Sequence, residues 1–453
     1  MRKMSKMLAA LLALIMTLTA CGMAAAEQEV RKIETPADAE EWIRTLFGEH
    51  PEELDTSWAL VPEAKEALAG AGGMKAVAMQ LAAFGEVKEI QPVYQKEIQG
   101  YQFFYIPCVF SMMPVDIVLV TLAGAVAGIQ TGAFSGQQEE EENTASSGPA
   151  SIELNLPVPA LEGELPGILT LPEGEGPFPA VVLVHGSGPN DMDETVYNIK
   201  PFKDLAEGLA AKGVAVYRYD KRTLVYGAEM AGNHQITLMD ETVDDAAAAV
   251  QLLAAQDKID SARIFVLGHS LGGNAIPAIA GVLKDQTVDG RGYIMMAASP
   301  RPQDELMREQ VDFLYSLAPE ITEKEQAEKD ALFAELDKLK DLDSLGDDDI
   351  ISSAYAPYWK WLAAYDILQA AKEIDKPVLL LQGEEDYQVT MTDFGIWQEA
   401  IGEKENWTLI SYPGLIHLFI TGQKAEGPNA YMKTEKVDEK VISDIAEFIE
   451  KNK

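Results

Sequence analysis

From residue 151 to residue 453, short apolar runs alternate with amphipathic segments. An uninterrupted apolar run is typical of a strand buried on both faces of a sheet, and apolar positions at helical spacing are typical of a surface helix. The runs that predict strands are 180–186, 214–220, 263–270, 292–299, 377–383 and 407–413, and the segments that predict helices are 202–213, 242–256, 273–283 and 440–451. This alternation predicts an α/β domain with a mostly parallel sheet and helices on both faces.

Residues 300–370 interrupt this alternation. They separate two expected strands, contain no expected strand, and have the composition of several helices. We expect this segment to form a helical cap over one end of the sheet; a helical decoration without a part in binding is the alternative. The aromatic residues of the segment that we expect to line an acyl or alcohol pocket are Tyr358, Trp359, Trp361 and Tyr365.

Residues 27–134 have a different pattern of apolar and polar positions. Two segments with helical spacing come first, and four β-rich runs follow, which predicts a separate α+β domain with an antiparallel sheet. The apolar run 114–128 is too short to cross a bilayer and contains Asp116, so we expect it to form a hairpin that turns near Gly124. The polar, charged stretch 135–150 is expected to link the two domains.

The first residues have the pattern of an export signal. A basic start precedes the apolar stretch 8–18, which is too short to span a bilayer. The following residues, Leu-Thr-Ala-Cys at 18–21, resemble the bacterial lipoprotein box. We therefore expect residues 1–20 to be a signal peptide and Cys21 to be lipidated, which anchors an exported protein at the outer face of the cell membrane. Plain secretion with cleavage after Ala26 is the alternative.

Composition narrows the classes of function. The chain has 453 residues and a formal net charge of −37, a field that repels nucleic acid, so nucleic-acid binding is set aside. It has two cysteines, and if Cys21 carries lipid then Cys108 has no partner for a disulfide or a cysteine-based metal site. Cys108 lies in an apolar run and is expected to be a core residue.

The sequence Gly-His-Ser-Leu-Gly-Gly at 268–273 predicts a nucleophile. Glycine-x-serine-x-glycine between a strand and a helix is the nucleophile elbow, in which a sharp turn exposes the serine hydroxyl. Ser270 holds its backbone at a strained angle, so close neighbours must lack side chains. The helix that follows directs its first amides, including that of Leu271, at an oxyanion formed on the substrate.

A serine nucleophile needs a base, and the chain has five histidines. His50 lies in the N-terminal domain, His234 lies in a polar loop, and His185 and His269 are expected to serve packing and turn support. His417 follows the last expected strand and precedes the final helix, which is where a hydrolase sheet presents its base. We therefore assign His417 as the general base and acid.

The base needs a carboxylate that fixes its tautomer. Three carboxylates, Glu384 to Asp386, follow the strand 377–383, and we assign Asp386 with Glu385 in reserve. The resulting chain order, serine then acid then histidine, is that of α/β-hydrolases. A second oxyanion donor is expected in the glycine-rich loop 185–189, with the amide of Ser187 as the best candidate.

Five motifs in order, HGSGPND, RYDKR, GHSLGG, LQGEEDYQV and PGLIHLF, resemble the α/β-hydrolase superfamily near its dienelactone hydrolase and serine aminopeptidase-like branches. The resemblance implies an α/β-hydrolase fold with Ser270, Asp386 and His417 as the triad. Thr223 stands where such relatives often have glycine, and the charged residues 218–222 are expected to brace loops near the site. Residues 27–134 resemble a small α+β domain of uncharacterised function that precedes the hydrolase in some exported bacterial enzymes.

The expected activity is the hydrolysis of a small-molecule carboxylic ester through an acyl-enzyme, without a metal or an organic cofactor. A serine aminopeptidase-like peptidase and an acyl-thioester hydrolase use the same machinery and remain alternatives. A surface-anchored binding protein with a relict site is the alternative from another class. The natural substrate, its acyl chain length, the role of the N-terminal domain and the oligomeric state stay open.

Overall fold

A computed structural model describes residues 30–48, 50–62, 64–65, 68, 73–81, 86–98, 101–110, 114–132, 149–158, 161, 163–318, 320–352, 354–433 and 435–452. The chain divides into two compact units, Met1–Ser146 and Ser147–Lys453, and each is described by itself. The boundary falls inside the expected linker 135–150, of which 149 and 150 alone are among the described residues. The expected signal peptide and Cys21 lie outside the described residues.

The N-terminal unit begins with helix α2 (Pro36–Leu46), whose start is capped by the Thr35 side chain and whose buried face includes Trp42 and Ile43. The Thr35 hydroxyl oxygen accepts a hydrogen bond from the Asp38 amide, and the Thr35 amide donates one to the Asp38 carboxylate, which satisfies two of the free amides at a helix start. The helical elements after α2 are η1 (Pro51–Glu53), α3 (Leu54–Ser57) and α5 (Gly73–Leu81).

Five antiparallel strands complete this unit: β1 (Val87–Ile90), β2 (Tyr94–Ile98), β3 (Tyr101–Phe110), β4 (Pro114–Leu122) and β5 (Ala125–Gly132). Their order is β1-β3-β4-β5, and β2 also pairs with β3. The strands β4 and β5 form the expected hairpin, which turns at Ala123 and Gly124 with φ of 50° and 81°. No helix in the described part of the chain is long and apolar enough to cross a bilayer.

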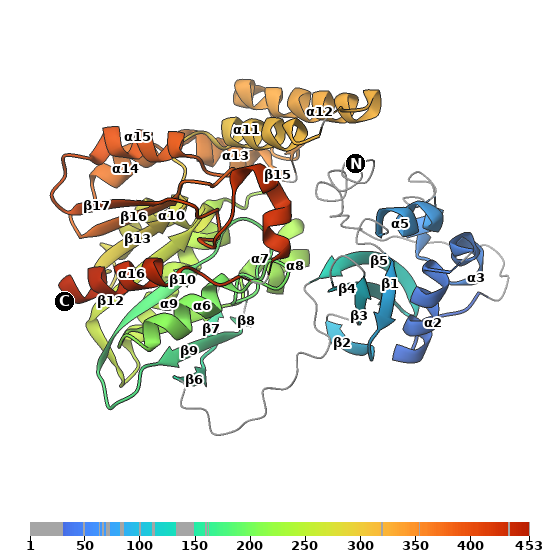
Figure 1. The fold of residues 1–453 in the computed structure, drawn as a ribbon, viewed down its shortest axis with the longest axis horizontal. Helices are drawn as coiled ribbons and strands as arrows, with labels where there is room; N and C mark the ends of the chain where they lie inside the picture. The colour runs from blue at the N-terminus through green and yellow to red at the C-terminus, as the bar shows by residue number, and fades with distance from the viewer. Residues whose placement is uncertain are drawn as a thin grey trace. The chain divides into compact units, whose positions relative to one another are not determined.

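The C-terminal unit is built on an eight-stranded sheet (Figure 1). Its strands, in spatial order, are β17 (Trp407–Tyr412), β16 (Val378–Gly383), β13 (Gly292–Met296), β12 (Ile259–His269), β10 (Phe178–Val184), β11 (Ala215–Tyr219), β9 (Gly167–Leu171) and β6 (Ala150–Glu153). The strands from β17 to β11 are parallel, and β9 and β6 continue the sheet antiparallel. A separate antiparallel pair, β7 (Leu156–Val158) with β8 (Gly163–Leu165), lies between β6 and β9 in the chain. The predicted mostly parallel sheet is confirmed.

Helices cover both faces of this sheet, as predicted. One apolar layer contains side chains of α9 (Asp244–Ala254), α10 (Leu271–Leu283) and α15 (Met391–Ile401). The opposite layer contains side chains of α6 (Pro201–Ala210) and α16 (Glu439–Lys451). The shorter helical elements of the unit are α7 (Arg222–Val225), α8 (Gly227–Ala231), the π-helical turn η4 (Met239–Val243) and η6 (Lys424–Met432). The architecture is the α/β-hydrolase fold.

The segment expected to form a cap contains α11 (Gln303–Ser316), α12 (Glu323–Leu336), η5 (Asp337–Ser344), α13 (Ala356–Ala364) and α14 (Ile367–Lys372). The expectation that it holds no strand is wrong, because β14 (Ile350–Ile351) and β15 (Ala354–Tyr355) form a short antiparallel pair. The buried Trp359 side chain donates a hydrogen bond from its indole N–H to the Ile351 carbonyl at 2.9 Å. This bond and the burial of Ile351 hold a pairing too short to leave a strand pattern in the sequence.

Candidate active site

Ser270 lies at the turn between β12 and α10, with φ of 52° and ψ of −119°. Residues other than glycine rarely adopt this backbone conformation. The flanking glycines allow this turn. A Cβ on Gly268 would lie 2.1 Å from the Gly272 carbonyl oxygen, and a Cβ on Gly272 would lie 2.2 Å from the Val184 carbonyl oxygen. Any side chain at either position would collide with backbone. The turn is therefore the strained elbow expected from the sequence, and it leads directly into the first turn of α10.

Asp386 and His417 meet in the interior at the carboxyl ends of β16 and β17. His417 Nδ1 lies 2.7 Å from Asp386 Oδ2, and both side chains are buried. The other carboxylate oxygen, Oδ1, accepts hydrogen bonds from the amides of Gln388 (2.7 Å) and Val389 (3.1 Å). These two backbone amides fix the carboxylate, and its Oδ2 faces Nδ1 of His417. The imidazole proton is therefore held at Nδ1, and Nε2 is left as the basic nitrogen.

Glu385, the reserve candidate for the acid, has another environment. Its Oε2 accepts a hydrogen bond from the Lys424 amide at 2.9 Å, and the residue lines a cavity of about 380 Å³ with Gly414, Gln423 and Glu426 among its neighbours. Asp386 rather than Glu385 is thus the carboxylate in contact with His417.

The loops that carry Ser270 and His417 are in direct contact. The ring of His269 lies 4.8 Å from the ring of His417, centroid to centroid, and its Nε2 donates a hydrogen bond to the His417 carbonyl at 3.0 Å. Among the described residues no hydrogen bond joins the Ser270 hydroxyl to His417. Catalytic hydrogen bonds of this type are often long before substrate binds and shorten in the complex.

The two expected oxyanion donors flank the same serine. Leu271 is the first residue of α10, and Ser187 follows Gly186 in the loop after β10. A Cβ on Gly186 would lie 3.1 Å from the Ser270 Cβ, which places this loop against the nucleophile. Within the described residues, neither the Leu271 amide nor the Ser187 amide donates a hydrogen bond to another group. Both amides are available to a developing negative charge near Ser270.

A buried ion pair next to the nucleophile was not anticipated. Glu194 has φ of 52°, and its Oε1 accepts a hydrogen bond from the Gly186 amide at 2.6 Å. Its Oε2 lies 2.8 Å from His269 Nδ1. The two nitrogens of His269 lie near the Glu194 carboxylate and the His417 carbonyl, an arrangement that favours the protonated ring. The pair therefore ties the loop of Gly186 to the loop of His417.

The pKa directions agree with this charge state. Burial lowers the pKa of His269, but the charge of Glu194, their contact and the His417 carbonyl outweigh burial, and the net pKa is raised. Burial raises the pKa of Glu194, but the charge of His269, its contact with that ring and the Gly186 amide together leave the pKa below its ordinary value. Each partner stabilises the charged form of the other.

The charged residues at 218–222 brace the loops, as the sequence predicts. Arg218 Nε donates to Asp193 at 2.8 Å, and Arg222 forms a two-pronged pair with Asp245. Lys221 Nζ donates to the Gly186 carbonyl at 2.8 Å. Thr223, which stands in the place of an expected glycine, donates from its hydroxyl to the Gly188 carbonyl at 3.1 Å, so this departure adds a contact to the same loop.

Sequence reasoning missed Glu194 and Glu241 as parts of this site. Glu194 lies among several acidic residues, "DMDET", and nothing in that pattern distinguishes it from its neighbours. Its positive φ and its burial become visible in the fold alone. Glu241 directly precedes the expected helix 242–256, in the acidic stretch MDETVDD at 239–245, where an acidic residue looks like a surface position.

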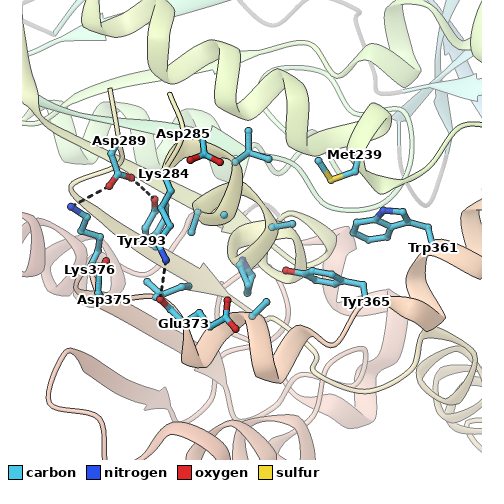
Figure 2. A pocket seen from close by; sticks show the side chains of 17 residues that line it. Met239, Lys284, Asp285, Asp289, Tyr293, Trp361, Tyr365, Glu373, Asp375 and Lys376 are labelled. Atoms are coloured by element: carbon cyan, nitrogen blue, oxygen red, sulfur yellow. Dashed lines mark hydrogen bonds and ion pairs between the residues drawn. The ribbon is translucent and has the colours of Figure 1, made fainter. Parts of the chain in front are cut away.

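A cavity of about 480 Å³ lies along the second half of α10 and the end of α14 (Figure 2). Trp361 and Tyr365 stack with ring centroids 4.9 Å apart at one end of it, and Lys376 pairs with Asp289 at the other. Ser270, Asp386 and His417 do not line this cavity. The structure thus places two of the four cap aromatics expected at an acyl pocket in a different cavity.

The other two aromatics of that set have structural partners. Trp359 is buried and donates a hydrogen bond to the Ile351 carbonyl, and the Tyr358 hydroxyl donates one to Glu241 at 2.7 Å.

In the described residues no group of three or more histidine, cysteine or acidic side chains is arranged to hold a metal ion.

With this geometry in view, comparison with known proteins assigns the family. The family model described as serine aminopeptidase, S33, matches residues 177–423, more than half of the chain. The chain belongs to the serine aminopeptidase S33 family. The matched range of this S33 chain contains Ser270, Asp386 and His417.

The S33 chain is also similar to individual proteins. It is 40% identical over 287 residues to Esterase EstD of Thermotoga maritima, a match that covers 63% of this chain and 66% of that esterase. Among solved structures it is similar to Est1E from Butyrivibrio proteoclasticus (17% identity, 66% of this chain, 98% of that chain, TM-score 0.42). It is also similar to a hyperthermophilic esterase from Pyrobaculum calidifontis (18%, 67% and 85%, TM-score 0.44). Those two scores are too low to add to the family assignment.

His185 gives a prediction about stability. Its ring is buried against Phe202 and Tyr219, and burial lowers its pKa from 6.5 to about 4. An unfolded chain therefore binds this proton first as the pH falls, so the free energy of unfolding decreases from about pH 6.5 down to about pH 4. We expect the difference in unfolding free energy between wild type and His185→Gln to shrink by about 2 kcal/mol from pH 7 to pH 5.

The measurement is urea unfolding of both proteins at the two pH values. The exposed His50, replaced by Gln, is the control and is expected to leave the pH dependence unchanged. A constant difference between wild type and His185→Gln across this range would contradict the lowered pKa.

Proposed function

We propose that this protein is a serine hydrolase that cleaves small carboxylic esters by two-step acyl transfer. Ser270 Oγ attacks the ester carbonyl while His417 Nε2 takes the hydroxyl proton, and the oxyanion receives hydrogen bonds from the Leu271 and Ser187 amides. The alcohol leaves with the proton from His417, and the acyl group stays on Ser270. Water then gives a proton to His417 and attacks the acyl carbon, and Ser270 leaves with that proton as the acid is released.

The observation that carries this proposal is the buried contact of Asp386 with His417 beside a serine in an elbow conformation. A carboxylate fixed by two amides has one strong remaining partner, and a histidine held by it has its second nitrogen available as a base. Two unpaired amides next to the same serine complete the requirements for acyl transfer. A binding protein with a relict site has no need of these features together.

The charges around the site favour an ester over an aminopeptidase substrate. An aminopeptidase needs an unpaired carboxylate to hold the substrate amine. Two carboxylates close to the Gly186 loop are already engaged: Glu194 pairs with His269, and Glu241 pairs with Lys221. The name of the Thermotoga maritima relative, an esterase, points the same way, although the match covers 66% of that protein.

The direct test compares an ester with an amide. We expect the purified protein to hydrolyse p-nitrophenyl acetate at least about 100-fold faster, by kcat/KM, than an aminoacyl p-nitroanilide, because Glu194 and Glu241 are already paired and so do not bind the substrate amine. Ser270→Ala is expected to lower ester turnover by about 10⁴-fold or more. Faster turnover of the anilide would favour the peptidase, and ester turnover that survives in Ser270→Ala would remove the catalytic role of the serine.

The assignment of the acid has its own test. Asp386→Asn keeps the size of the side chain but no longer holds the proton at Nδ1 of His417, so we expect kcat to fall by about 10⁴-fold. The matched control, Glu385→Gln, is expected to keep kcat within about threefold, since Glu385 faces another cavity. Steady-state kinetics on p-nitrophenyl acetate measures both. Equal losses in the two variants would show that Asp386 has no special role.

We further propose that the chain is exported and anchored to the membrane by lipid on Cys21, with 135–150 as the link between the units. The support is the apolar stretch 8–18 followed by the lipoprotein-box residues 18–21. We expect metabolic labelling with palmitate to tag the wild-type protein and not Cys21→Ser, because a hydroxyl does not form the thioether. The control Cys108→Ser is expected to keep the label. Wild-type protein without label would leave plain secretion as the alternative.

A further inference from the structure

The peptide unit that joins Gly186 to Ser187 lies against the nucleophile. Gly186 is buried, and a Cβ on it would be 3.1 Å from the Ser270 Cβ. The N–H of this peptide belongs to Ser187, the oxyanion donor of the proposed function, and its C=O belongs to Gly186. What holds the carbonyl therefore also orients the donor.

A buried cation holds that carbonyl. Lys221 Nζ donates to the Gly186 oxygen at 2.8 Å, and the Lys221 side chain is 3% exposed. Asn190 Nδ2 donates to the same oxygen at 3.2 Å. A charged donor in an interior of low dielectric interacts more strongly than a neutral one, so Lys221 dominates this contact.

The ammonium group is itself held in place from the opposite side. Glu241 Oε1 lies 2.5 Å from Lys221 Nζ, and Glu241 Oε2 accepts the Tyr358 hydroxyl at 2.7 Å. Burial, together with the charge of Glu241, raises the pKa of Tyr358 well above its ordinary value, so the hydroxyl stays protonated and donates. The chain of contacts runs from cap helix α13 through Glu241 and Lys221 to the Gly186 carbonyl.

The geometry of a peptide bond transmits this contact to the donor. Among the described residues the cis peptide bond is Gly176–Pro177, so the bond from Gly186 to Ser187 is trans. In a planar trans peptide the C=O and the N–H point in opposite directions. A cation bound to the oxygen therefore directs the N–H away from Lys221, and it draws electron density toward the oxygen, which makes the N–H a stronger donor.

We propose that Lys221 is a positioning residue for the oxyanion hole, which orients and polarises the Gly186–Ser187 peptide so that the Ser187 N–H stabilises the transition state. Glu241 and Tyr358 keep the ammonium at the carbonyl. This inference rests on the proposed function, because it assigns a role within the same acyl transfer. The contacts of Lys221 Nζ are with the Gly186 carbonyl oxygen and the Glu241 carboxylate, so we expect Lys221 to act through the donor peptide.

The test uses the full-length protein with Lys221→Met and with the double variant Lys221→Met, Glu241→Gln. The double variant removes both charges of the buried pair and so leaves no unpaired charge that would destabilise the fold. The matched control is Lys212→Met, which breaks a pair with Glu439 (2.8 Å) between the turn after α6 and the start of α16. Circular dichroism melting verifies that each variant is folded.

Two readouts separate a role in the oxyanion hole from general support. The first is the steady-state kinetics of p-nitrophenyl acetate, and the second is inhibition by 1,1,1-trifluoroacetone, whose adduct with Ser270 carries an oxyanion. We expect the folded Lys221 variants to lose about 10- to 100-fold in kcat with KM within about threefold, less than the loss typical of deleting a donor outright. The Ki of the ketone is expected to rise by the factor by which kcat/KM falls.

Several outcomes would overturn the inference. These are a folded double variant with kcat within twofold of wild type, a loss confined to KM, or a fall in kcat with no change in Ki. Lys212→Met with an equal loss would also do so. Failure of the proposed function gives a different result: wild type would not turn over the ester, or Ser270→Ala would remain active. If the inference about Lys221 alone fails, wild type is active and Ser270→Ala is inactive, and only the Lys221 variants depart from the expected values.

Discussion

Contact of backbone against backbone at the nucleophile turn is the constraint on which the site depends. Gly272, in the first turn of α10, packs so closely on the end of β10 that a methyl group there would lie 2.2 Å from the Val184 oxygen. Gly268 is as close to Gly272. The chain accepts a strained conformation at Ser270 because these contacts leave no other path from β12 into α10. The same packing sets the hydroxyl beside the loop that follows β10.

Buried charge then fixes the loops that surround the turn. The Gly186 residue is held at both ends, by Glu194 at its N–H and by Lys221 at its C=O. His269 connects Glu194 to the His417 carbonyl, so the loop of the oxyanion donor and the loop of the base share one network. Breaking such a network leaves an uncompensated buried charge, which is strongly destabilising. Strain at the serine and charge around it thus act together to make the site rigid.

The sequence predicts the parts of this arrangement that local rules govern. The alternation of apolar runs and amphipathic segments predicts the sheet and its helices, and the glycines around Ser270 predict a sharp turn because a single stretch of chain must satisfy it. The contact of Asp386 with His417 could be predicted because the carboxyl ends of parallel strands meet at one edge of a sheet. The pairing of β14 with β15 could not be predicted, because two-residue strands are too short to show an alternating pattern in the sequence.

The contacts that escaped prediction join residues far apart along the chain. Lys221 contacts Gly186 across 35 positions and Glu241 across 20, and no spacing rule connects them. An acidic residue in the acidic stretch 239–245 also looks like a solvated surface position, which hides Glu241. The cap aromatics show the same ambiguity, because side chains at helical spacing fit a cavity wall or a core equally well. Trp361 and Tyr365 line a cavity that Ser270 does not line, while Tyr358 reaches the Glu241 carboxylate.

The placement of Glu241 shows how the cap and the oxyanion loop become connected. Glu241 lies in η4, a π-helical turn (Met239–Val243) at the start of α9. A π turn contains one more residue than an α turn and so re-aims the side chains within it, which is why such turns recur at functional sites. Here the re-aimed carboxylate meets Lys221 from the loop after β11 on one oxygen and Tyr358 from α13 on the other. A local irregularity in one helix thus lets a single, partly buried carboxylate join the cap to the peptide that faces the nucleophile.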